Sequence, residues 1–475
     1  FLPCTRKGQF SKILIMLDEH RTNFINIVKW FLLATVIGAL VGVLDAAFLK
    51  ILDASIEWRN GIPLFYLGLP VFLYIVALLG RKTAKRDKDF STDAVINKIN
   101  AQRPISFISI LKGFTLPIVT MVSGGSAGKE APCADVGAGV SSILARLLRM
   151  DPENQRKMMI CGVSAGFAGV FGVPISGALF GLEVLWVGHI FYEVMFPALV
   201  AGITAFQVTS FLGVDYIYHP LHFVPVFSEQ FFLKMIVAGM FFGLVSILFI
   251  EISKFARVVF RYIALRTRLF WACMIGGLVL VAIGYFASPI YLGLGMPGID
   301  MALNGEPLLS PFGFLYKIIT TSVTFAAGGI GGVVTPIFFV GAQAGAMLAD
   351  FMRVDSATLA ALGLVAVLAG TANTPLAASI MAIELFGPAI APYATVVCVI
   401  SFLITGRQSI YPSQLISMDS GKTLEEEPDL HHKHYGRRAS DRKQRIHPRK
   451  TLLKKAVREM VRHLIPNPKG FDEQK

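Results

Sequence analysis

A glutamate beside a glycine-rich segment is the first candidate for chemistry in this sequence. Residues 124–130 read Gly-Gly-Ser-Ala-Gly-Lys-Glu, and Pro132 follows. Proline is tolerated in the first turn of a helix, so a helix is expected to begin where the glycine-rich segment ends. The unpaired N–H groups of a helix start bind anions, and glycine lets the backbone approach an ion closely. The segment therefore predicts an anion site with Glu130 beside it.

Glu130 itself has two interpretations. A carboxylate surrounded by apolar sequence is costly to bury, so its presence needs a reason. As a first-turn residue it could satisfy the N–H groups of its own helix. Alternatively, the carboxylate occupies the place of the anion when ionised and leaves it when protonated, which would make Glu130 a gate. Lys129 could draw anions to the entrance or merely extend its charge to a membrane surface.

The glycine-rich pattern occurs a second time in the chain. Residues 128–138 and 332–342 share the pattern G-x-x-x-P-x-x-x-V-G-A, and residues 326–332 are again rich in glycine. Many transporters consist of two such units inserted with opposite orientation. The sequence thus predicts an internal duplication in which Glu130 corresponds to Val334. Two helix starts that meet from opposite orientations would form one central anion site.

A pair of glutamates supports the duplication. Pro174 precedes Glu183 by nine residues, and Pro375 precedes Glu384 by the same nine. Because each half of the chain carries this glutamate, we expect Glu183 to have a structural role.

The elements that position these segments are expected to lie in a membrane. Apolar residues make up 54% of the 475 residues and charged residues 16%, a balance outside the range of soluble domains. Several apolar stretches reach or approach the roughly 20 residues that cross a hydrocarbon core. They are residues 24–50, 64–79, 158–186, 189–213, 231–250, 269–288, 313–327 and 389–405. The shorter ones contain glycine or proline, which predicts helices that stop midway around an enclosed site.

The net charge of +13 is concentrated at the end of the chain, where residues 431–475 hold 14 Lys/Arg and 4 Asp/Glu. The positive-inside rule places this segment in the cytosol, on the same side as the basic loop of residues 81–88. Nucleic acid is not expected as a partner, because the charge lies on this tail. We expect a cytosolic N-terminal helix over residues 1–22, transmembrane repeats over 23–214 and 226–418, and a basic cytosolic tail over 419–475.

The sequence predicts neither a cofactor nor a metal site. The five cysteines form no C-x-x-C pair, and His431, His432, His434 and His447 of the tail are expected to be solvated. No Ser/His, H-E-x-x-H or paired-carboxylate constellation is present, so the protein is expected not to be an enzyme.

Two motifs carry a resemblance to a known family. Residues 128–132, Gly-Lys-Glu-Ala-Pro, resemble the G-R/K-E-G-P motif of CLC chloride channels and transporters, and residues 331–336, Gly-Gly-Val-Val-Thr-Pro, resemble their G-G-x-F-x-P motif. The likeness covers residues from about 20 to 418 and includes Tyr411 near the end of the last apolar segment. It implies an all-α membrane protein with the CLC fold, two inverted-topology repeats of tilted and broken helices, of the prokaryotic type without CBS domains.

The resemblance also implies roles for particular residues. Glu130 would be the external gating glutamate, and Tyr411 would donate its hydroxyl to the central anion. The backbone around Gly128, Lys129 and Glu130, and at Val333 and Val334, would bind the permeating ions. The central serine of the family is replaced in an uncertain register, by Phe90 or by Ser91. Valine stands at 334 where phenylalanine is usual. Val184 occupies the position of the internal proton-transferring glutamate of many exchangers, and valine cannot carry a proton.

These features predict transport of chloride or a similar small anion through a pore in each subunit of a homodimer, channel-like or weakly coupled to protons. The resemblance places the protein among the lipids of a cell membrane, a prokaryotic inner membrane, with both termini in the cytosol. The alternatives are a fluoride/proton antiporter of the same family, a chloride/proton exchanger and, from a different class, a secondary transporter of organic anions.

Overall fold

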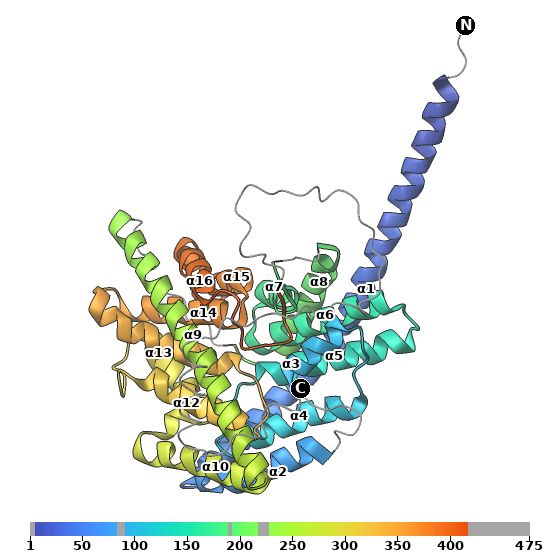
Figure 1. The fold of residues 1–475 in the computed structure, drawn as a ribbon. Coiled ribbons are helices and arrows are strands. Elements are labelled where there is room, and N and C mark those ends of the chain that lie inside the picture. Colours follow the sequence, from blue (N-terminus) through green and yellow to red (C-terminus); the bar gives the residue numbers. More distant parts are fainter. Residues whose placement is uncertain (1–4, 83–90, 189–191, 217–227, 417–475) are drawn as a thin grey trace, which may run out of the picture. The chain divides into compact units, whose positions relative to one another are not determined.

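The computed structural model describes residues 5–82, 91–188, 192–216 and 228–416, within a compact unit that ends at Met418 (Figure 1). The expected basic tail over 419–475 lies outside the described residues. The helices are α1 (Thr5–Asn60), α2 (Leu69–Lys82), α3 (Thr92–Asn100), α4 (Phe107–Val122), α5 (Glu130–Leu147), α6 (Pro152–Phe171), α7 (Pro174–Glu183), α8 (Tyr192–Phe211), α9 (Glu229–Arg266), α10 (Leu269–Phe286), α11 (Met296–Leu303), α12 (Gly313–Ala326), α13 (Val334–Met352), α14 (Ser356–Ala372), α15 (Pro375–Phe386) and α16 (Ala391–Thr405). Short 3-10 turns cover Phe65–Gly68, Pro289–Tyr291 and Pro388–Ile390.

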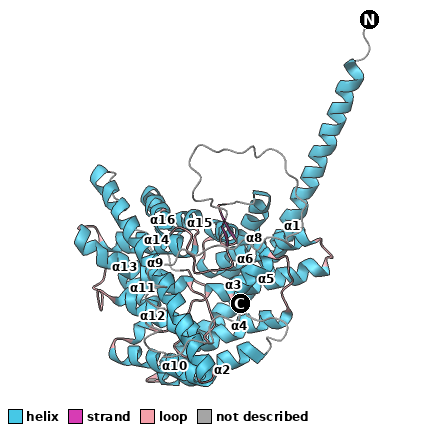
Figure 2. Cartoon of the chain, in the orientation of Figure 1, coloured by secondary structure: helices cyan, strands magenta, loops and turns pink. Residues whose placement is uncertain are grey.

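Helices make up almost all of the regular structure (Figure 2). Two short strands, β1 (Trp186–Val187) and β2 (Leu415–Ile416), pair in parallel and connect the end of the first half of the chain with the end of the second. Helix α1 is continuous through residue 22, so no break marks the boundary expected there between a cytosolic helix and the first repeat. The all-helical membrane fold expected from the sequence is confirmed.

The helices differ in length, as the apolar pattern predicted. Six of the described helices are long and apolar enough to cross a membrane: Glu19–Asn60, Tyr192–Phe211, Glu229–Arg266, Leu269–Phe286, Val334–Met352 and Pro388–Thr405. Others stop short. Helix α7 has 10 residues, so at 1.5 Å per residue it spans only about half of a hydrocarbon core roughly 30 Å thick. The apolar stretch 158–186 is therefore two helices, α6 and α7, separated at Pro174.

The two halves use the same helix contact. Helix α5 packs on α6 where Gly137 meets Gly162, and α13 packs on α14 where Gly341 meets Gly363. In each pair a Cβ added to one glycine would collide with the backbone of the other. Gly137 and Gly341 are the glycines of the repeated V-G-A motif. The repeat found in the sequence is thus a repeat of backbone-to-backbone helix packing.

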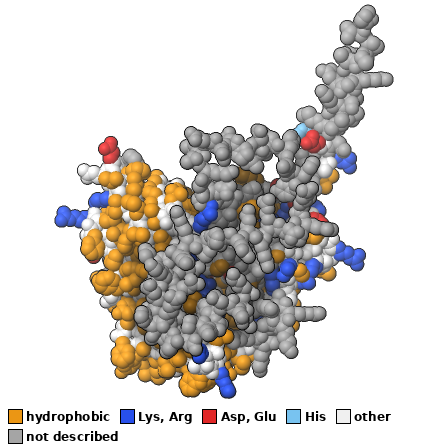
Figure 3. Space-filling model, viewed as in Figure 1, with side chains coloured by type: hydrophobic (Ala, Val, Ile, Leu, Met, Phe, Trp, Pro, Cys, Tyr) orange, Lys and Arg blue, Asp and Glu red, His pale blue; other side chains and the backbone are white. Residues whose placement is uncertain are grey.

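Much of the described surface is apolar. Large hydrophobic side chains are exposed on α9 and α10, and they include Leu233, Leu244 and Leu278. Figure 3 shows hydrophobic side chains over much of the left part of the molecule, where α12 and α13 lie in Figure 1. An exposed apolar surface of this extent is typical of contact with lipid.

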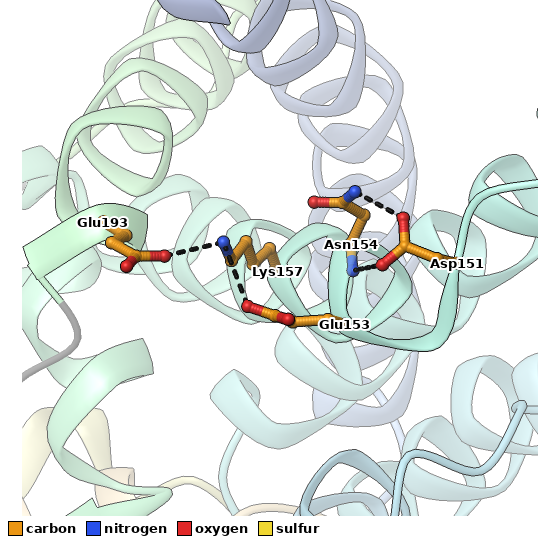
Figure 4. Close-up of polar contacts among 5 residues, drawn as sticks. All are labelled: Asp151, Glu153, Asn154, Lys157 and Glu193. Carbon is orange, nitrogen blue, oxygen red and sulfur yellow. Dashed lines mark hydrogen bonds and ion pairs between the residues drawn. The ribbon is translucent and has the colours of Figure 1, made fainter. Parts of the chain in front are cut away.

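A polar cluster marks the start of α6 (Figure 4). The Asp151 carboxylate caps the helix by accepting the N–H of Asn154 over 3.2 Å, and this bond holds the pKa of that carboxyl below its usual range. Lys157 lies 2.7 Å from Glu193 on α8 and 3.4 Å from Glu153. Charges of this kind are expected where helices reach water, so the cluster marks one end of α6 and α8 as an aqueous boundary.

The glycine contact yields a prediction about stability. Replacing Gly137 by alanine forces α5 away from α6, and overpacking of this kind costs about 1–3 kcal/mol. We expect Gly137→Ala to lower the unfolding temperature of the detergent-solubilised protein, followed by loss of the monodisperse peak in size-exclusion chromatography. Gly61→Ala is the control, because its added Cβ comes no closer than 3.5 Å to a neighbour. Equal unfolding temperatures for the two variants would contradict the packing argument.

Candidate functional site

The two glycine-rich turns meet in the structure. Gly128 donates its N–H to the carbonyl of Gly332 over 2.7 Å, and Gly332 donates to Gly128 over 2.8 Å. Each turn begins with a glycine at positive φ, Gly124 at +100° and Gly328 at +104°, a conformation that other residues rarely adopt. The segments 126–132 and 331–336 are therefore adjacent, as the predicted two-fold site requires.

Hydroxyl groups fix the two turns to each other. Thr324 on α12 accepts the N–H of Ser126 over 3.0 Å, and Thr120 on α4 accepts the N–H of Ile330 over 3.2 Å. The two bonds are related by the internal repeat, and each threonine lies four residues before the glycine at positive φ. The sequence analysis did not identify these threonines, although their equal spacing in the two halves was a usable signal.

Glu130 lies across the junction between the halves. It is the first residue of α5 and is 2% exposed. Its Oε1 accepts the N–H of Val334 over 2.6 Å, and its Oε2 accepts the hydroxyl of Thr335 over 2.8 Å and the N–H of Thr335 over 3.3 Å. These donors belong to the first turn of α13, where N–H groups lack helical partners. The carboxylate thus binds the helix start of the opposite half.

The residues flanking Glu130 take different positions. Lys129 precedes α5 without capping it and is half-buried. Val333 precedes α13 in the same way, and the side chain of Val334 is fully buried. The backbone of Gly128 is used in the bridge to Gly332. Among these predicted anion-binding positions, the N–H of Val334 is directed at the carboxylate of Glu130.

A second group of predicted residues lies at the start of α3. Ser91 caps this helix through a bond from the N–H of Ala94, and it is exposed. Asp93 accepts both the N–H of Ser413, over 2.6 Å, and its hydroxyl, over 2.8 Å. This contact holds the segment after α16 against α3. Phe90, the alternative to Ser91, lies outside the described residues.

Tyr411 is buried, with 5% of its surface exposed, and it interacts electrostatically with Glu130, Asp93 and Asp135. Val184 is also buried, at the end of α7. It lies two residues before β1, the strand that pairs with Leu415 and Ile416. Ser413, two residues after Tyr411, binds Asp93, so the structure brings the segment of Tyr411 to the helix that Ser91 caps, and it places an apolar side chain at 184.

Glu183 and Glu384 bind the helix starts of opposite halves. Glu183 accepts the N–H groups of Leu376, over 3.2 Å, and Ala377, over 2.8 Å, at the start of α15. Glu384 accepts those of Ile175, over 2.9 Å, and Ser176, over 2.8 Å, at the start of α7. Each carboxylate thus satisfies the free N–H groups of a helix start in the opposite half, which is a structural role.

Comparisons with known proteins agree with this geometry. The profile of the voltage gated chloride channel family matches residues 71–406, more than half of the chain. The chain belongs to the CLC family. A relative from Pseudomonas syringae pv. tomato, named chloride/fluoride channel protein, is 34% identical over 86% of this chain and 91% of its own length.

Solved structures of CLC proteins have the same fold. The crystal structure of a CLC-type fluoride/proton antiporter matches with a TM-score of 0.77 and 28% identity, over 83% of this chain and 99% of the other. The crystal structure of a slow cyanobacterial Cl⁻/H⁺ antiporter matches with a TM-score of 0.72 and 20% identity, over 80% of this chain and 96% of the other. At this identity the match shows a shared fold alone. As a CLC protein, the chain is an anion transport protein of a membrane.

The reciprocal glutamates give a test of structural role. Glu183→Ala leaves the N–H groups of Leu376 and Ala377 without an acceptor, and each unpaired buried group costs roughly 1–3 kcal/mol. We expect Glu183→Ala and Glu384→Ala to lower the unfolding temperature by similar amounts. Glu251→Ala is the control, since Glu251 pairs with Lys254 at the surface and such pairs contribute little. A Glu183→Ala protein as stable as this control would contradict the structural role.

Proposed function

We propose that this protein moves small anions across the membrane along a path gated by Glu130. The observation that carries the proposal is the contact of the Glu130 carboxylate with the N–H groups of Val334 and Thr335. A carboxylate and a halide compete for the same donors, because both are anions that bind at a helix start. In the described arrangement the carboxylate occupies a place that a dehydrated anion would take.

Protonation provides the opening step. A neutral carboxylic acid is a weaker acceptor for N–H groups than a carboxylate, since charge-assisted hydrogen bonds are about twice as strong as neutral ones. Glu130 would then release the start of α13, and an anion would replace it. The Glu130 carboxylate forms no ion pair with the Lys129 side chain, and its donors at the start of α13 are N–H and hydroxyl groups, so we infer that the field at the site comes mainly from these dipoles.

Fluoride is the substrate that we favour, with chloride as the alternative. A small anion loses a large hydration energy on entering a pore, and it needs several close donors in exchange. The donor set at α13 combines two N–H groups with the Thr335 hydroxyl. The relative and the solved structure with the higher identities both carry fluoride in their names.

The wider arrangement follows from family membership. We propose a homodimer with a separate path in each subunit, repeats over 23–214 and 226–418, and both chain ends on the cytosolic side. The basic residues among 81–88 would then face the cytosol, and Ser91 follows three positions after residue 88.

The proposal is tested by anion efflux from liposomes that contain the purified protein. We expect efflux of both fluoride and chloride above that of empty liposomes, with fluoride faster, recorded with ion-selective electrodes. Gluconate and citrate serve as organic anions in the same assay. Efflux of these but of neither halide would assign the protein to organic-anion transport.

A second measurement tests the gate. Glu130→Gln cannot be ionised, so its anion flux is expected to be nearly independent of external pH, whereas flux through the parent rises as external pH falls. Glu57→Gln is the control, because Glu57 is an exposed carboxyl outside the site. If Glu130→Gln keeps the pH response of the parent, Glu130 is not the gate.

A further inference from the structure

Helix α5 carries a second buried carboxyl group besides Glu130. Asp135 lies five residues further along the helix, about 7.5 Å along its axis and about 140° around it, and it is 4% exposed. Its side chain accepts a hydrogen bond from the Thr92 hydroxyl over 3.3 Å. No arginine or lysine among the described residues forms an ion pair with it. A buried acid with so little compensation is unusual in a membrane protein and indicates a function.

The groups around Asp135 come from three parts of the chain. Thr92, Asp93 and Lys98 lie on α3, which packs against α5 at this point. Glu130 lies on α5 itself, and Tyr411 follows α16. On α1, Asp45 faces Cys133 instead; two residues along a helix correspond to a rotation of about 200°, so Asp45 and Asp135 lie on opposite sides of α5.

Asp135 therefore lies between the start of α3 and the gate. Ser91 is exposed and begins the first turn of α3, and Thr92, the next residue, binds Asp135. Asp135 interacts electrostatically with Glu130, and Tyr411 interacts with both carboxyls. Ser91 is exposed, Thr92 is partly buried, and Asp135 and Glu130 are both almost fully buried.

We propose that Asp135 carries protons between the cytosol and Glu130, the task for which Val184 is unsuited. This inference rests on the proposed Glu130-gated anion transport and adds proton coupling to it. The protonated Asp135 loses its O–H proton to the Tyr411 hydroxyl or to a water molecule, which passes its own proton to the Glu130 carboxylate. Asp135, now a carboxylate, takes up a proton from cytosolic water. One proton has moved from the cytosol to Glu130, and no other bond has changed.

Asp135→Asn separates proton movement from anion movement. Glu130 can still be protonated from the external side in this variant, so anion flux continues. Proton flux driven by an anion gradient is expected to fall about a hundredfold, the lower end of what a positioned proton-transfer group contributes. Both fluxes are recorded on the same liposomes, with a fluoride electrode and a pH electrode. Asp135→Glu restores a carboxyl group and is expected to restore proton flux.

Asp45→Asn is the matched control, because Asp45 is as buried as Asp135 but faces Cys133. It is expected to keep the ratio of protons to anions of the parent. The inference is overturned if Asp135→Asn keeps that ratio, or if a folded Asp135→Asn loses both fluxes together. If Asp135→Asn does not fold, Asp135→Glu is the deciding variant. The inference is overturned if proton flux through Asp135→Glu depends on internal pH in the same way as proton flux through the unsubstituted protein. If the unsubstituted protein moves anions without protons, this inference is overturned and the Glu130 gate is unaffected. If the unsubstituted protein moves no anion, the proposed function is overturned.

Discussion

The contact between the Glu130 carboxylate and the first turn of α13 is the interaction on which the site depends. It joins a charged group from one half of the chain to the free N–H groups of the other. This contact requires the two helix starts to keep their relative position. The Gly128–Gly332 bridge and the hydroxyls of Thr120 and Thr324 hold them there. Because backbone dipoles supply the field, the site can hold an anion without a neighbouring cation.

The membrane environment explains why the halves bind each other so extensively. A helix that stops inside the hydrocarbon leaves N–H groups that water cannot reach, and each must find an acceptor within the protein. Glu183 supplies acceptors for α15, and Glu384 supplies them for α7. The duplication provides these partners in pairs, since a glutamate that binds one broken helix has a counterpart that binds the other. The repeat thus supplies the acceptors that the broken helices need.

The sequence predicted the backbone of the site better than its side-chain partners. Glycine, proline and the repeated V-G-A motif report directly on local conformation and close packing, so the helix starts at Glu130 and Val334 followed from spacing alone. The hydrogen bonds of Thr120 and Thr324 did not, because a threonine in an apolar helix has the same appearance whether its hydroxyl binds its own helix or another. Asp135 was missed for a similar reason, since its burial depends on how α3 packs against α5.

The proposed carboxylate gate would link the anion path to a supply of protons. The ionised Glu130 accepts the N–H groups of α13 that an anion would need, so in the proposed mechanism the anion enters when the carboxylate is neutral or displaced. Whether the protein exchanges protons for anions then depends on whether the proton can also leave toward the cytosol. The resemblance places the internal acid of many exchangers at position 184, where this chain has a valine at the end of α7. Helix α5 carries its own second acid, and a helix holds two side chains at a fixed separation more reliably than a loop does. The apolar residue at 184 is therefore weak evidence for a channel, because the capacity to move protons is a property of the whole route to Glu130 and not of one position.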